Sequence, residues 1–501
     1  MNRRDFVKTL LAGGASALFH RVHAFDLPSA LAKSRFLPPV QVNTFSSEIV
    51  MNSRRSYHGG YTNNMSDQIL ANVLWATSRA PMIGANRTIY VANNDNVYYY
   101  DPLLHDIILH LSGNHKSEAN AAFEVGVASD LAEDAGIALH YALLASVSFW
   151  TNTSSQPACC PKESARTNAN STWNPTTSIH IANCYGLIGT VSGINSQCVA
   201  ISSNSSLPDP STDGPVLLEN ALADLRYADQ FSSNDPTLEQ LSQIAWASYG
   251  NTPHMTSNNR AGITAASAVA NYYLTGRIYI VRPEGVERYH IRLPSGQAST
   301  RDHRIERVTD GDQRPQLRAA VPRIPQAAPA YFVYCAATAD RWQRVEAGYC
   351  AAGALLQATS MGLQGYFTGD FTSVEQTAII NALSIPSSHL PLVVFSGGQE
   401  LTGIGETKKM NIGSIAAFPN PFKENTHIKY ALMSTAHVDL SVYDLSGRRI
   451  TNLVNRKQPA GNFAVNWNGT DTYGRRLPGG KYSVVLRTSN KKQRTIIAKI
   501  N

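Results

Sequence analysis

Apolar residues recur at helical spacing in two similar stretches of this chain. The first is "SDQILANVLWATSR" (Ser66–Arg79), and the second, about 170 residues later, is "LEQLSQIAWASYGN" (Leu238–Asn251). In both stretches an amphipathic pattern leads to a Trp-Ala pair, and this spacing predicts a helix with one buried face. The chain therefore contains the same predicted helix twice.

Alternating patterns predict a pair of strands after each of these helices. "RTIYVANNDNVYYYDPLLHDIIL" (Arg87–Leu109) and "GRIYIVRPEGVERYHIRLP" (Gly276–Pro294) both indicate a strand, a turn and a second strand. Continuous apolar runs at "APAYFVYCAA" (Ala328–Ala337) and "HLPLVVFSGG" (His389–Gly398) are typical of buried strands.

Longer apolar stretches complete the pattern. Phe123–Trp150 and Val345–Leu363 have helical spacing and enough length for buried helices, and Leu217–Phe231 also has a helical pattern. A helix, a Trp-Ala helix, two strands and a long helix thus occur twice in the same order. This order predicts a tandem duplication, with a first unit at residues 45–150 and a second at 216–400. The alternative is a chance similarity between two αβ segments.

Two other regions differ from these units. Residues 151–215 are rich in Ser, Thr, Asn and Pro, which predicts an insert without a core of its own, apart from a possible strand at "YGLIGTV". Residues 401–416 are predicted to be a linker. From residue 417 to residue 501, alternating runs separated by "SG", "AG", "YG" and "PGG" turns predict a small all-β sandwich.

The N-terminus and the charge distribution bear on location and partners. "NRRDFVK" (Asn2–Lys8), a short apolar core and "VHA" resemble a twin-arginine export signal over residues 1–24; the alternative is an ordinary amphipathic N-terminus. Residues 401–501 hold 16 Lys/Arg and 5 Asp/Glu, so their net charge is +11. Because the whole chain has a net charge of +7, residues 1–400 have a net charge of −4. The basic residues are dispersed, so no nucleic-acid partner is predicted. No stretch after the N-terminus has 18 uncharged apolar residues, so no membrane span is predicted either.

The six cysteines do not form a C-x-x-C pattern. In an oxidising compartment, disulfides among Cys159, Cys160, Cys184 and Cys198 could hold the predicted insert, whereas Cys335 and Cys350 are interpreted as small buried hydrophobic residues. The series His105, His110 and His115 could suggest a metal site. We interpret these histidines as surface and strand-end residues, and no metal is predicted.

The repeated stretches carry a family resemblance. "LEQLSQIAWASYGN", "IYIVRPEGVERYHI" and "AGYCAAGALLQATSMGLQGYFTGDF" together resemble the nitroreductase superfamily, most closely its SagB-type dehydrogenases. The resemblance covers about Arg54–Gln399 and is better in the second half. Members are α+β proteins that bind FMN across a dimer interface. The resemblance therefore implies a duplicated α+β fold in which one chain builds that interface as a pseudo-dimer.

The flavin site that this resemblance implies is composite. "RRSYHGGY" is similar to the family's Arg-Arg-Ser-x-Arg motif, "AASAVAN" to its Pro-Ser-Ala loop with Ala266 in place of proline, and "GLQGYFTG" to its glycine loop. The counterparts of these motifs in the other half are degraded, so one site is expected. It requires the first two motifs and the glycine loop to line one cleft, and it includes no assignable catalytic residue. The implied cofactor-binding residues are Arg54, Arg55, Ser56, Ser267, Asn271, Gly365, Tyr366, Gly369 and Lys408.

The C-terminal region carries a second resemblance. Pro-Asn-Pro-Phe, Tyr-Asp-x-x-Gly-Arg, Trp-x-Gly-x-Asp-x-x-Gly and Gly-x-Tyr stand in order, as in FlgD-like, Por-secretion-type C-terminal domains. Such domains are immunoglobulin-like sandwiches that serve in sorting or surface attachment. In this chain we expect Trp467 to lie in the core and Asn468–Gly474 to form turns.

Two hypotheses about function follow from these resemblances. The first is an exported FMN-dependent oxidoreductase that transfers a hydride through flavin N5 to or from a small molecule or peptide. The alternative is a nitroreductase scaffold that has lost its flavin and acts as an exported binding or surface protein. The periplasm, the cell surface and the medium are all open as destinations.

Overall fold

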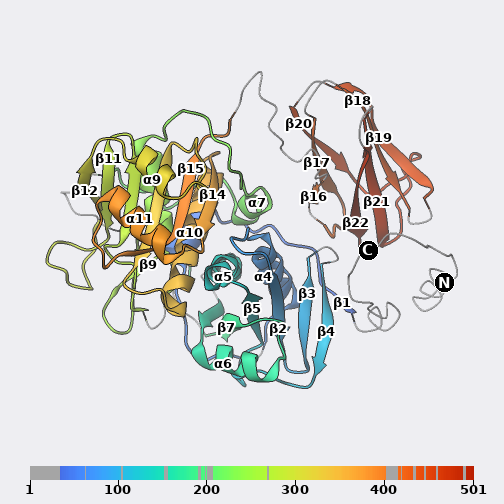
Figure 1. Ribbon diagram of the computed structural model, residues 1–501. Helices are drawn as coiled ribbons and strands as arrows, with labels where there is room; N and C mark the ends of the chain where they lie inside the picture. The colour runs from blue at the N-terminus through green and yellow to red at the C-terminus, as the bar shows by residue number, and fades with distance from the viewer. Residues whose placement is uncertain are drawn as a thin grey trace.

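The computed structural model describes residues 34–500 except for 63, 103–104, 152–155, 190–192, 198, 200–206, 268–269, 402–415, 419, 433–435, 445–446, 459–460 and 489–491. Figure 1 shows a first α/β unit in blue to green, a second in yellow-green to orange, and a red β-sandwich. The predicted fold class, α+β with a C-terminal all-β domain, agrees with this architecture.

The first unit is a seven-stranded antiparallel sheet in the order β1-β4-β3-β2-β5-β7-β6. Its helix α4 is the predicted first Trp-Ala helix, and the Ser66 side chain caps its first turn by accepting from the Ile69 N–H. Its elements are α3 (Ser47–Ser53), α4 (Asp67–Arg79), α5 (Ala132–Val147), α6 (Glu163–Thr172), β1 (Ser34–Phe36), β2 (Arg87–Ala92), β3 (Asn96–Asp101), β4 (Asp106–Ser112), β5 (Phe123–Ser129), β6 (Gln156–Pro161) and β7 (Ile179–Ile188).

The second unit has a six-stranded antiparallel sheet in the order β12-β11-β10-β13-β15-β14. Helix α8, the second Trp-Ala helix, starts with a capping box formed by Thr237 and Gln240. Its elements are α7 (Leu218–Ala223), α8 (Leu238–Tyr249), α9 (Arg314–Ala320), α10 (Arg341–Ser360), α11 (Ser373–Leu383), β8 (Asn251–Met255), β9 (Ala261–Ile263), β10 (Ile278–Arg282), β11 (Gly285–His290), β12 (Arg304–Asp310), β13 (Ala330–Ala336), β14 (Gln364–Gly369) and β15 (Leu390–Gly398).

The two sheets share one topology. Without β1, the first order is β4-β3-β2-β5-β7-β6, and it matches β12-β11-β10-β13-β15-β14 strand for strand in sequence order. A buried Tyr-His pair also recurs: the Tyr100 hydroxyl lies 2.6 Å from His105 Nδ1, and the Tyr289 hydroxyl lies 2.8 Å from His303 Nδ1. This correspondence is what a duplication would produce, and the duplication itself stays a prediction.

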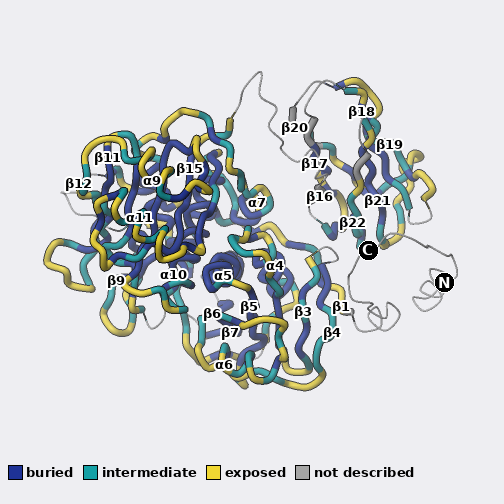
Figure 2. Tube along the Cα trace, in the orientation of Figure 1, coloured by how far each residue is buried: buried dark blue, intermediate teal, exposed yellow. Residues whose placement is uncertain are grey.

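The long helices α5 and α10 join the two units. All residues of α5 are buried, and Figure 2 shows it dark blue at the centre of the molecule. A methyl group on Gly136 would lie 2.2 Å from the carbonyl oxygen of Val345, and one on Gly348 would lie 2.2 Å from that of Glu133. Because the contact is reciprocal and the residues are equivalently spaced, the helices cross about a pseudo-twofold axis, as in an isologous dimer.

The predicted elements differ from the structure in four places. Arg87–Leu109, predicted as two strands, contains β2, β3 and most of β4. Residues 156–188 are not an insert: β6, α6 and β7 complete the first sheet, and Trp173 is fully buried beneath them. The overall polar composition concealed two short apolar runs, which are buried by neighbouring elements. Phe123–Trp150 divides into β5 and α5, and only Leu218–Ala223 of the predicted helix at Leu217–Phe231 is helical.

The cysteines also require a correction. Cys159, Cys160 and Cys184 are buried free thiols, so the predicted disulfides among them are absent; Cys198 lies outside the described residues. Their sulfur atoms have other neighbours, since that of Cys159 lies 3.2 Å from Ser146 Oγ and that of Cys160 lies 3.1 Å from the Tyr61 hydroxyl. Cys335 in β13 and Cys350 in α10 are fully buried, which confirms their interpretation as core residues.

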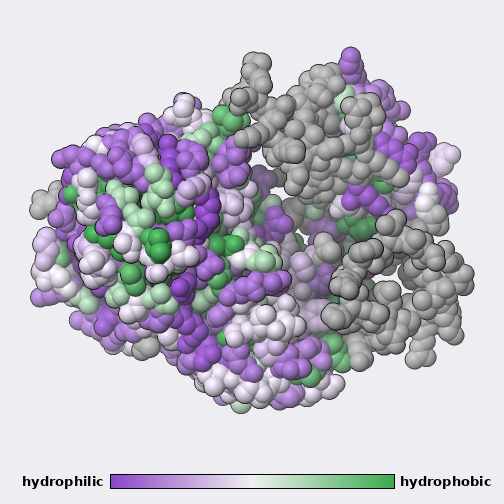
Figure 3. All heavy atoms as spheres, in the orientation of Figure 1, coloured by the Kyte–Doolittle hydropathy of each residue, from purple (hydrophilic) through white to green (hydrophobic). Residues whose placement is uncertain are grey.

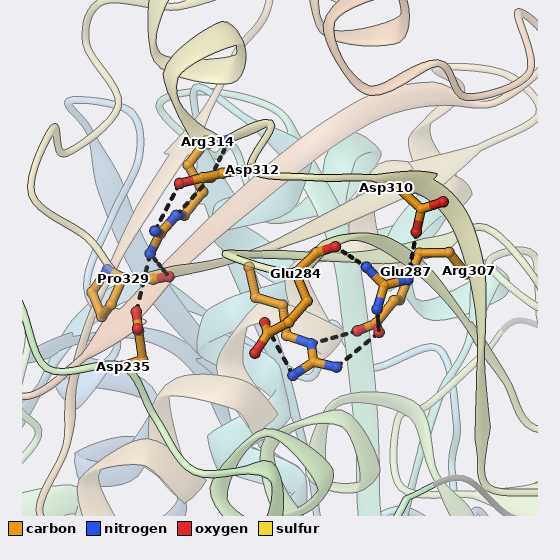
Figure 4. Close-up of polar contacts among 9 residues, drawn as sticks. Asp235, Glu284, Glu287, Arg307, Asp310, Asp312, Arg314 and Pro329 are labelled. Atoms are coloured by element: carbon orange, nitrogen blue, oxygen red, sulfur yellow. Dashed lines mark hydrogen bonds and ion pairs between the residues drawn. The ribbon is translucent and has the colours of Figure 1, made fainter.

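Ion pairs stabilise the polar edge of the second sheet (Figure 4). Glu287 of β11 accepts hydrogen bonds from Arg282 of β10 and Arg307 of β12, at 2.7 and 2.9 Å. Arg314 at the start of α9 bonds to both carboxylate oxygens of Asp312. These contacts link three adjacent strands and the following helix.

The C-terminal domain is a sandwich of two antiparallel sheets, β16-β17-β20 and β19-β18-β21-β22. Trp467 is buried in its core between Phe422 and Tyr482, with ring centroids 5.4 and 5.6 Å away, and Gly469 and Gly474 have positive φ in the predicted turn. The strands are β16 (Ala416–Phe418), β17 (Thr426–Leu432), β18 (Ala436–Tyr443), β19 (Arg449–Gln458), β20 (Gly461–Trp467), β21 (Gly480–Arg487) and β22 (Lys492–Lys499).

The surface in Figure 3 is mostly hydrophilic over the two α/β units, with apolar residues scattered among polar ones. Within the part of the chain that the structure describes, no helix is both long and apolar enough to cross a bilayer. The same described residues contain no group of three or more His, Cys, Asp or Glu side chains placed to hold a metal ion.

Candidate functional site

Arg54 lies where the two units meet, directly after α3. Its side chain is fully buried and crosses to the second unit, where Nε donates to the Thr264 carbonyl at 3.0 Å and Nη2 donates to those of Ile263 and Ala265 at 2.9 and 2.8 Å. Burial lowers the pKa of Arg54, and the neighbours that act against this shift are Tyr and Cys side chains rather than carboxylates. A buried cation without an acidic partner favours an anion nearby.

Arg55 and Ser56 follow on the same turn and are half-buried. The Arg55 guanidinium carbon lies 5.9 Å from the centroid of the Trp150 ring, and the Tyr57 ring lies 6.2 Å from that ring. The Arg55 guanidinium interacts with the Tyr57 side chain, but its Nε atom is buried and has no hydrogen-bond partner among the described residues. A donor left in this state costs free energy unless a ligand or water meets it.

Ser267 belongs to the loop whose carbonyl groups bind Arg54. Its hydroxyl accepts a hydrogen bond from the Tyr272 N–H at 2.8 Å and so fixes the turn that leads to β10. Asn271 is exposed and donates to the Tyr273 hydroxyl at 2.9 Å. The structure therefore brings the Arg-Arg-Ser turn of the first unit to the Ser267 loop of the second. We call this junction the first seam.

Three residues of the long helices complete the first seam. Glu346 and Tyr349 come from α10 and His140 comes from α5, and the rings of His140 and Tyr349 have centroids 5.9 Å apart. Buried polar atoms without a hydrogen-bond partner occur on all three: Glu346 Oε2, the Tyr349 hydroxyl, and both ring nitrogens of His140. The sequence analysis missed them because helical spacing within an apolar stretch favours a packing role. An acidic residue in the middle of a buried helix was the available signal.

The charges within the first seam are unequal. Burial and the nearby Arg54 charge lower the pKa of His140 to about 3, so the imidazole is neutral at pH 7. Burial raises the pKa of Glu346 to about 7, although the hydroxyl groups of Ser267 and Tyr249 and the N–H of Leu274 act in the opposite direction. The seam is therefore positive on the Arg54 side and carries a half-ionised carboxyl on the other.

Gly365, Tyr366 and Gly369 lie at a different junction, the second seam. They form strand β14 rather than an open loop, and Gly365 donates to the carbonyl of Arg226 at 2.9 Å and accepts from the N–H of Ala228 at 3.0 Å. The Tyr366 ring stacks on that of Tyr227 with a centroid distance of 4.9 Å. A methyl group on Gly369 would touch Ile83 of the first unit.

The predicted residues are thus divided between two places. The Ala228 N–H donates to the Gly365 carbonyl of β14, as the Tyr57 N–H donates to the Cys159 carbonyl of β6. Arg226–Ala228 of the second unit therefore corresponds to Arg55–Tyr57 of the first, and each turn packs against β14 or β6 of its own sheet. The better match to the family's Arg-Arg-Ser motif lies in the first half of the chain, and the better match to its glycine loop lies in the second half. For this reason the structure does not bring Gly365–Gly369 to Arg55 and Ser267. Lys408 lies outside the described residues.

The second seam also has a counterpart of Glu346. Asp134 occupies the equivalent position on α5, two residues before Gly136 as Glu346 is two before Gly348. Its Oδ1 and Oδ2 accept the N–H groups of Ile83 and Gly84 at 2.7 and 2.8 Å. Both oxygens are satisfied at this seam, whereas at the first seam one oxygen of the carboxyl is free.

A flavin mononucleotide needs cationic or N–H donors for its phosphate, donors for its ring acceptors, and an aromatic or apolar shelf. The first seam supplies part of this set, namely the unpartnered Arg55 Nε, the unpartnered Tyr349 hydroxyl and the rings of Trp150 and Tyr57, but it lacks the glycine loop that the predicted composite site requires. The second seam does not supply this set, because the backbone groups of Gly365 are bonded within the protein and Tyr227 covers Tyr366.

Comparison with known proteins matches residues 230–399 to the Nitroreductase family and residues 422–492 to the FlgD Ig-like domain. A protein of Methanocaldococcus jannaschii named as a nitroreductase is 28% identical over 193 residues, which span 35% of this chain and 90% of the relative. A solved structure named as a nitroreductase from Anabaena variabilis has a TM-score of 0.47 and 11% identity, covering 74% of this chain and 94% of its own. One from Desulfovibrio desulfuricans in complex with FMN has a TM-score of 0.25 and 14% identity, covering 38% and 90%.

Proposed function

Because residues 230–399 form a nitroreductase-family domain and residues 422–492 a FlgD Ig-like domain, we propose that this chain is an exported FMN-dependent oxidoreductase of the nitroreductase type. The observation that carries the proposal is the first seam. It holds a fully buried arginine without an acidic partner, next to a second arginine with an unpartnered donor. Such a site attracts an anion, and the phosphate of FMN is one.

Different residues of the first seam would bind different parts of FMN. Arg55 supplies the phosphate-binding guanidinium, since the bonds of Arg54 to the 263–265 carbonyls hold the two units in register. The Tyr349 hydroxyl, which is buried without a partner among the described residues, would donate a hydrogen bond to the ligand, and the rings of Trp150 and Tyr57 would form the shelf and exclude water. A bound flavin would supply hydride transfer at N5. The substrate class stays a small molecule or a peptide.

A second candidate function has its own support. Arg54 already has three carbonyl acceptors, and the glycine strand lies at the other seam instead of beside Ser267. Both facts favour a scaffold that binds a partner or an anionic ligand other than flavin and performs no redox chemistry. The two candidates differ in one property, the presence of FMN.

The visible absorbance spectrum of the purified mature chain tests the proposal. We expect a flavin band near its usual position, and release of FMN on denaturation at about one equivalent per chain. Arg55→Gln should weaken FMN binding roughly tenfold or more, because a charge-assisted hydrogen bond contributes about 1.5–3 kcal/mol. The matched variant Arg226→Gln changes the equivalent arginine of the second seam and should leave binding unchanged.

The absence of FMN, or its loss in the other variant, would contradict the proposal. A colourless chain that does not take up added FMN would exclude the oxidoreductase and leave the binding scaffold. FMN lost in Arg226→Gln and retained in Arg55→Gln would move the site to the second seam.

A further inference from the structure

We propose that Glu346 is a proton-exchanging residue of the first seam, and that it takes up a proton when an anionic flavin binds there. This inference rests on the proposed function for the identity of the ligand. The step is a proton transfer from solvent to Glu346 Oε2, with no change in covalent bonds elsewhere and no oxidant or reductant involved.

The geometry of Glu346 is the first support. Its Oε1 accepts hydrogen bonds from the Tyr249 hydroxyl at 2.5 Å and the Leu274 N–H at 3.2 Å. Its Oε2 is buried, and among the described residues, which exclude 268–269 of the facing loop, no hydrogen bond reaches that oxygen. An ionised carboxylate with a bare buried oxygen is costly, and protonation of that oxygen converts it into a donor. A protonated Oε2 can then donate to an acceptor atom of a ligand in the seam.

Comparison across the pseudo-twofold axis is the second support. Asp134, the counterpart at the second seam, has an N–H donor on each carboxylate oxygen; burial raises its pKa, and these two donors act against that shift. At Glu346 the hydrogen bonds from Tyr249 and Leu274 both reach Oε1, and the Ser267 hydroxyl lies beside the same carboxyl. The chain therefore keeps one of two equivalent acids incompletely paired, at the seam whose other polar groups are also unpartnered.

The surrounding groups make Glu346 the residue that titrates near neutral pH. Those facing it are Tyr249 of α8, Ser267 and Tyr272 of the loop after β9, and Tyr349 and Cys350 of α10, with Arg54 and His140 beyond Tyr349. Burial raises the pKa values of the tyrosines and of Cys350, so they stay neutral. His140 is neutral above pH 3–4, and Arg54 keeps its proton. Over pH 6–8 the charge of this cluster therefore changes at Glu346.

The ionisation of Glu346 determines how the affinity for FMN changes with pH. Above pH 7 the Glu346 carboxylate repels an anionic ligand, and below pH 7 the neutral acid does not. We expect the dissociation constant of FMN to rise about tenfold between pH 6 and pH 8, beyond the change caused by the phosphate itself, whose second ionisation is near pH 6.

Fluorescence titration with FMN at pH 6, 7 and 8 tests the inference in three chains. Glu346→Gln mimics the neutral acid, so it should bind FMN as tightly as the unchanged chain at pH 6 and lose the pH-dependent weakening that is specific to Glu346. Asp134→Asn alters the equivalent acid of the second seam and should keep the pH dependence. The phosphate ionisation is common to all three chains and cancels in the comparison.

The thermal stability of the ligand-free protein also depends on the ionisation of Glu346. Because the folded pKa of Glu346 is raised above its ordinary value of 4.5, its ionisation destabilises the fold as pH rises from about 4.5 to 7 and the penalty is constant above that range. The Tm of Glu346→Gln should therefore exceed that of the unchanged chain by a margin that grows between pH 5 and pH 7.5.

The outcomes separate the two proposals. FMN binding with the same pH dependence in all three chains would overturn the role of Glu346 and leave the flavin site intact. No FMN binding at any pH would overturn the proposed function, and the Tm comparison would still decide whether Glu346 exchanges a proton. A Tm difference that is constant with pH would overturn the inference.

Discussion

At the scale of single residues, Arg54 connects the two units through backbone carbonyls instead of through a carboxylate. Its three hydrogen bonds reach the carbonyl groups of three consecutive residues, Ile263–Ala265. This segment leads into the Ser267 turn. The position of that turn, and with it the shape of the first seam, therefore depends on one guanidinium from the other half of the chain.

Replacement of Arg54 by Met tests this dependence. The change leaves three buried carbonyl groups unpaired, so we expect the free energy of unfolding to fall by roughly 2–5 kcal/mol in urea titration. Arg35→Met is the matched control, because Arg35 pairs with Asp67 at an exposed site, and it should cost less than about 1 kcal/mol. Equal small losses in both variants would contradict the assigned role of Arg54.

At the scale of elements, the crossing of α5 and α10 determines how close the two units come. Gly136 and Gly348 allow backbone to meet backbone, and a methyl group at either position would fall 2.2 Å from a carbonyl oxygen of the facing helix. Real non-bonded contacts do not reach this distance, so the helices would have to separate.

Gly348→Ala and Gly136→Ala test the crossing. Alanine is the better helix former by about 1 kcal/mol, so a stabilising effect is the expectation from propensity alone. We expect the clash to outweigh it and to lower the free energy of unfolding by about 2 kcal/mol or more. Gly189→Ala, where nothing lies within 4 Å of the added methyl group, should have little effect. Stabilisation by Gly348→Ala, measured by the same urea titration, would exclude a tight crossing.

At the scale of the whole molecule, the chain combines an α/β pair of units with a basic C-terminal sandwich. The FlgD Ig-like match at residues 422–492 and the Arg3-Arg4 sequence at the N-terminus both support the proposal of export. A twin-arginine route would carry the chain folded, which suits buried free thiols such as Cys159 that an oxidising compartment would otherwise reach.

Substitution of the paired arginines tests this route. The double variant Arg3→Lys with Arg4→Lys keeps the positive charge and removes the guanidinium pair, so we expect the precursor to stay in the cytoplasm of the producing bacterium. Immunodetection in cell fractions measures the change. The control Lys8→Arg should be exported normally, and export of the double variant at the normal level would rule out the twin-arginine route.

The sequence by itself determined the elements and their repetition. Periodicity located both Trp-Ala helices, the strand pair β10 and β11 and the C-terminal sandwich, because local spacing reflects which face of an element is buried. The motifs also indicated resemblances to the nitroreductase and FlgD-like families, and residues 230–399 and 422–492 match the models of these families. Residues 156–188 were misjudged, because their apolar runs are short and are buried by other parts of the chain.

Only the tertiary structure decided which motifs meet. Arg55 and Gly365 both fit one motif set in the sequence, yet the pseudo-twofold crossing at Gly136 and Gly348 assigns them to different seams. Glu346 gave almost no signal, since its environment is made by donors on α8 and the loop before β10, both of which reach Oε1, while no described residue bonds to Oε2. Side-chain periodicity records burial along one element, whereas a binding site depends on the relative placement of several elements, and that placement is set by packing between the two halves.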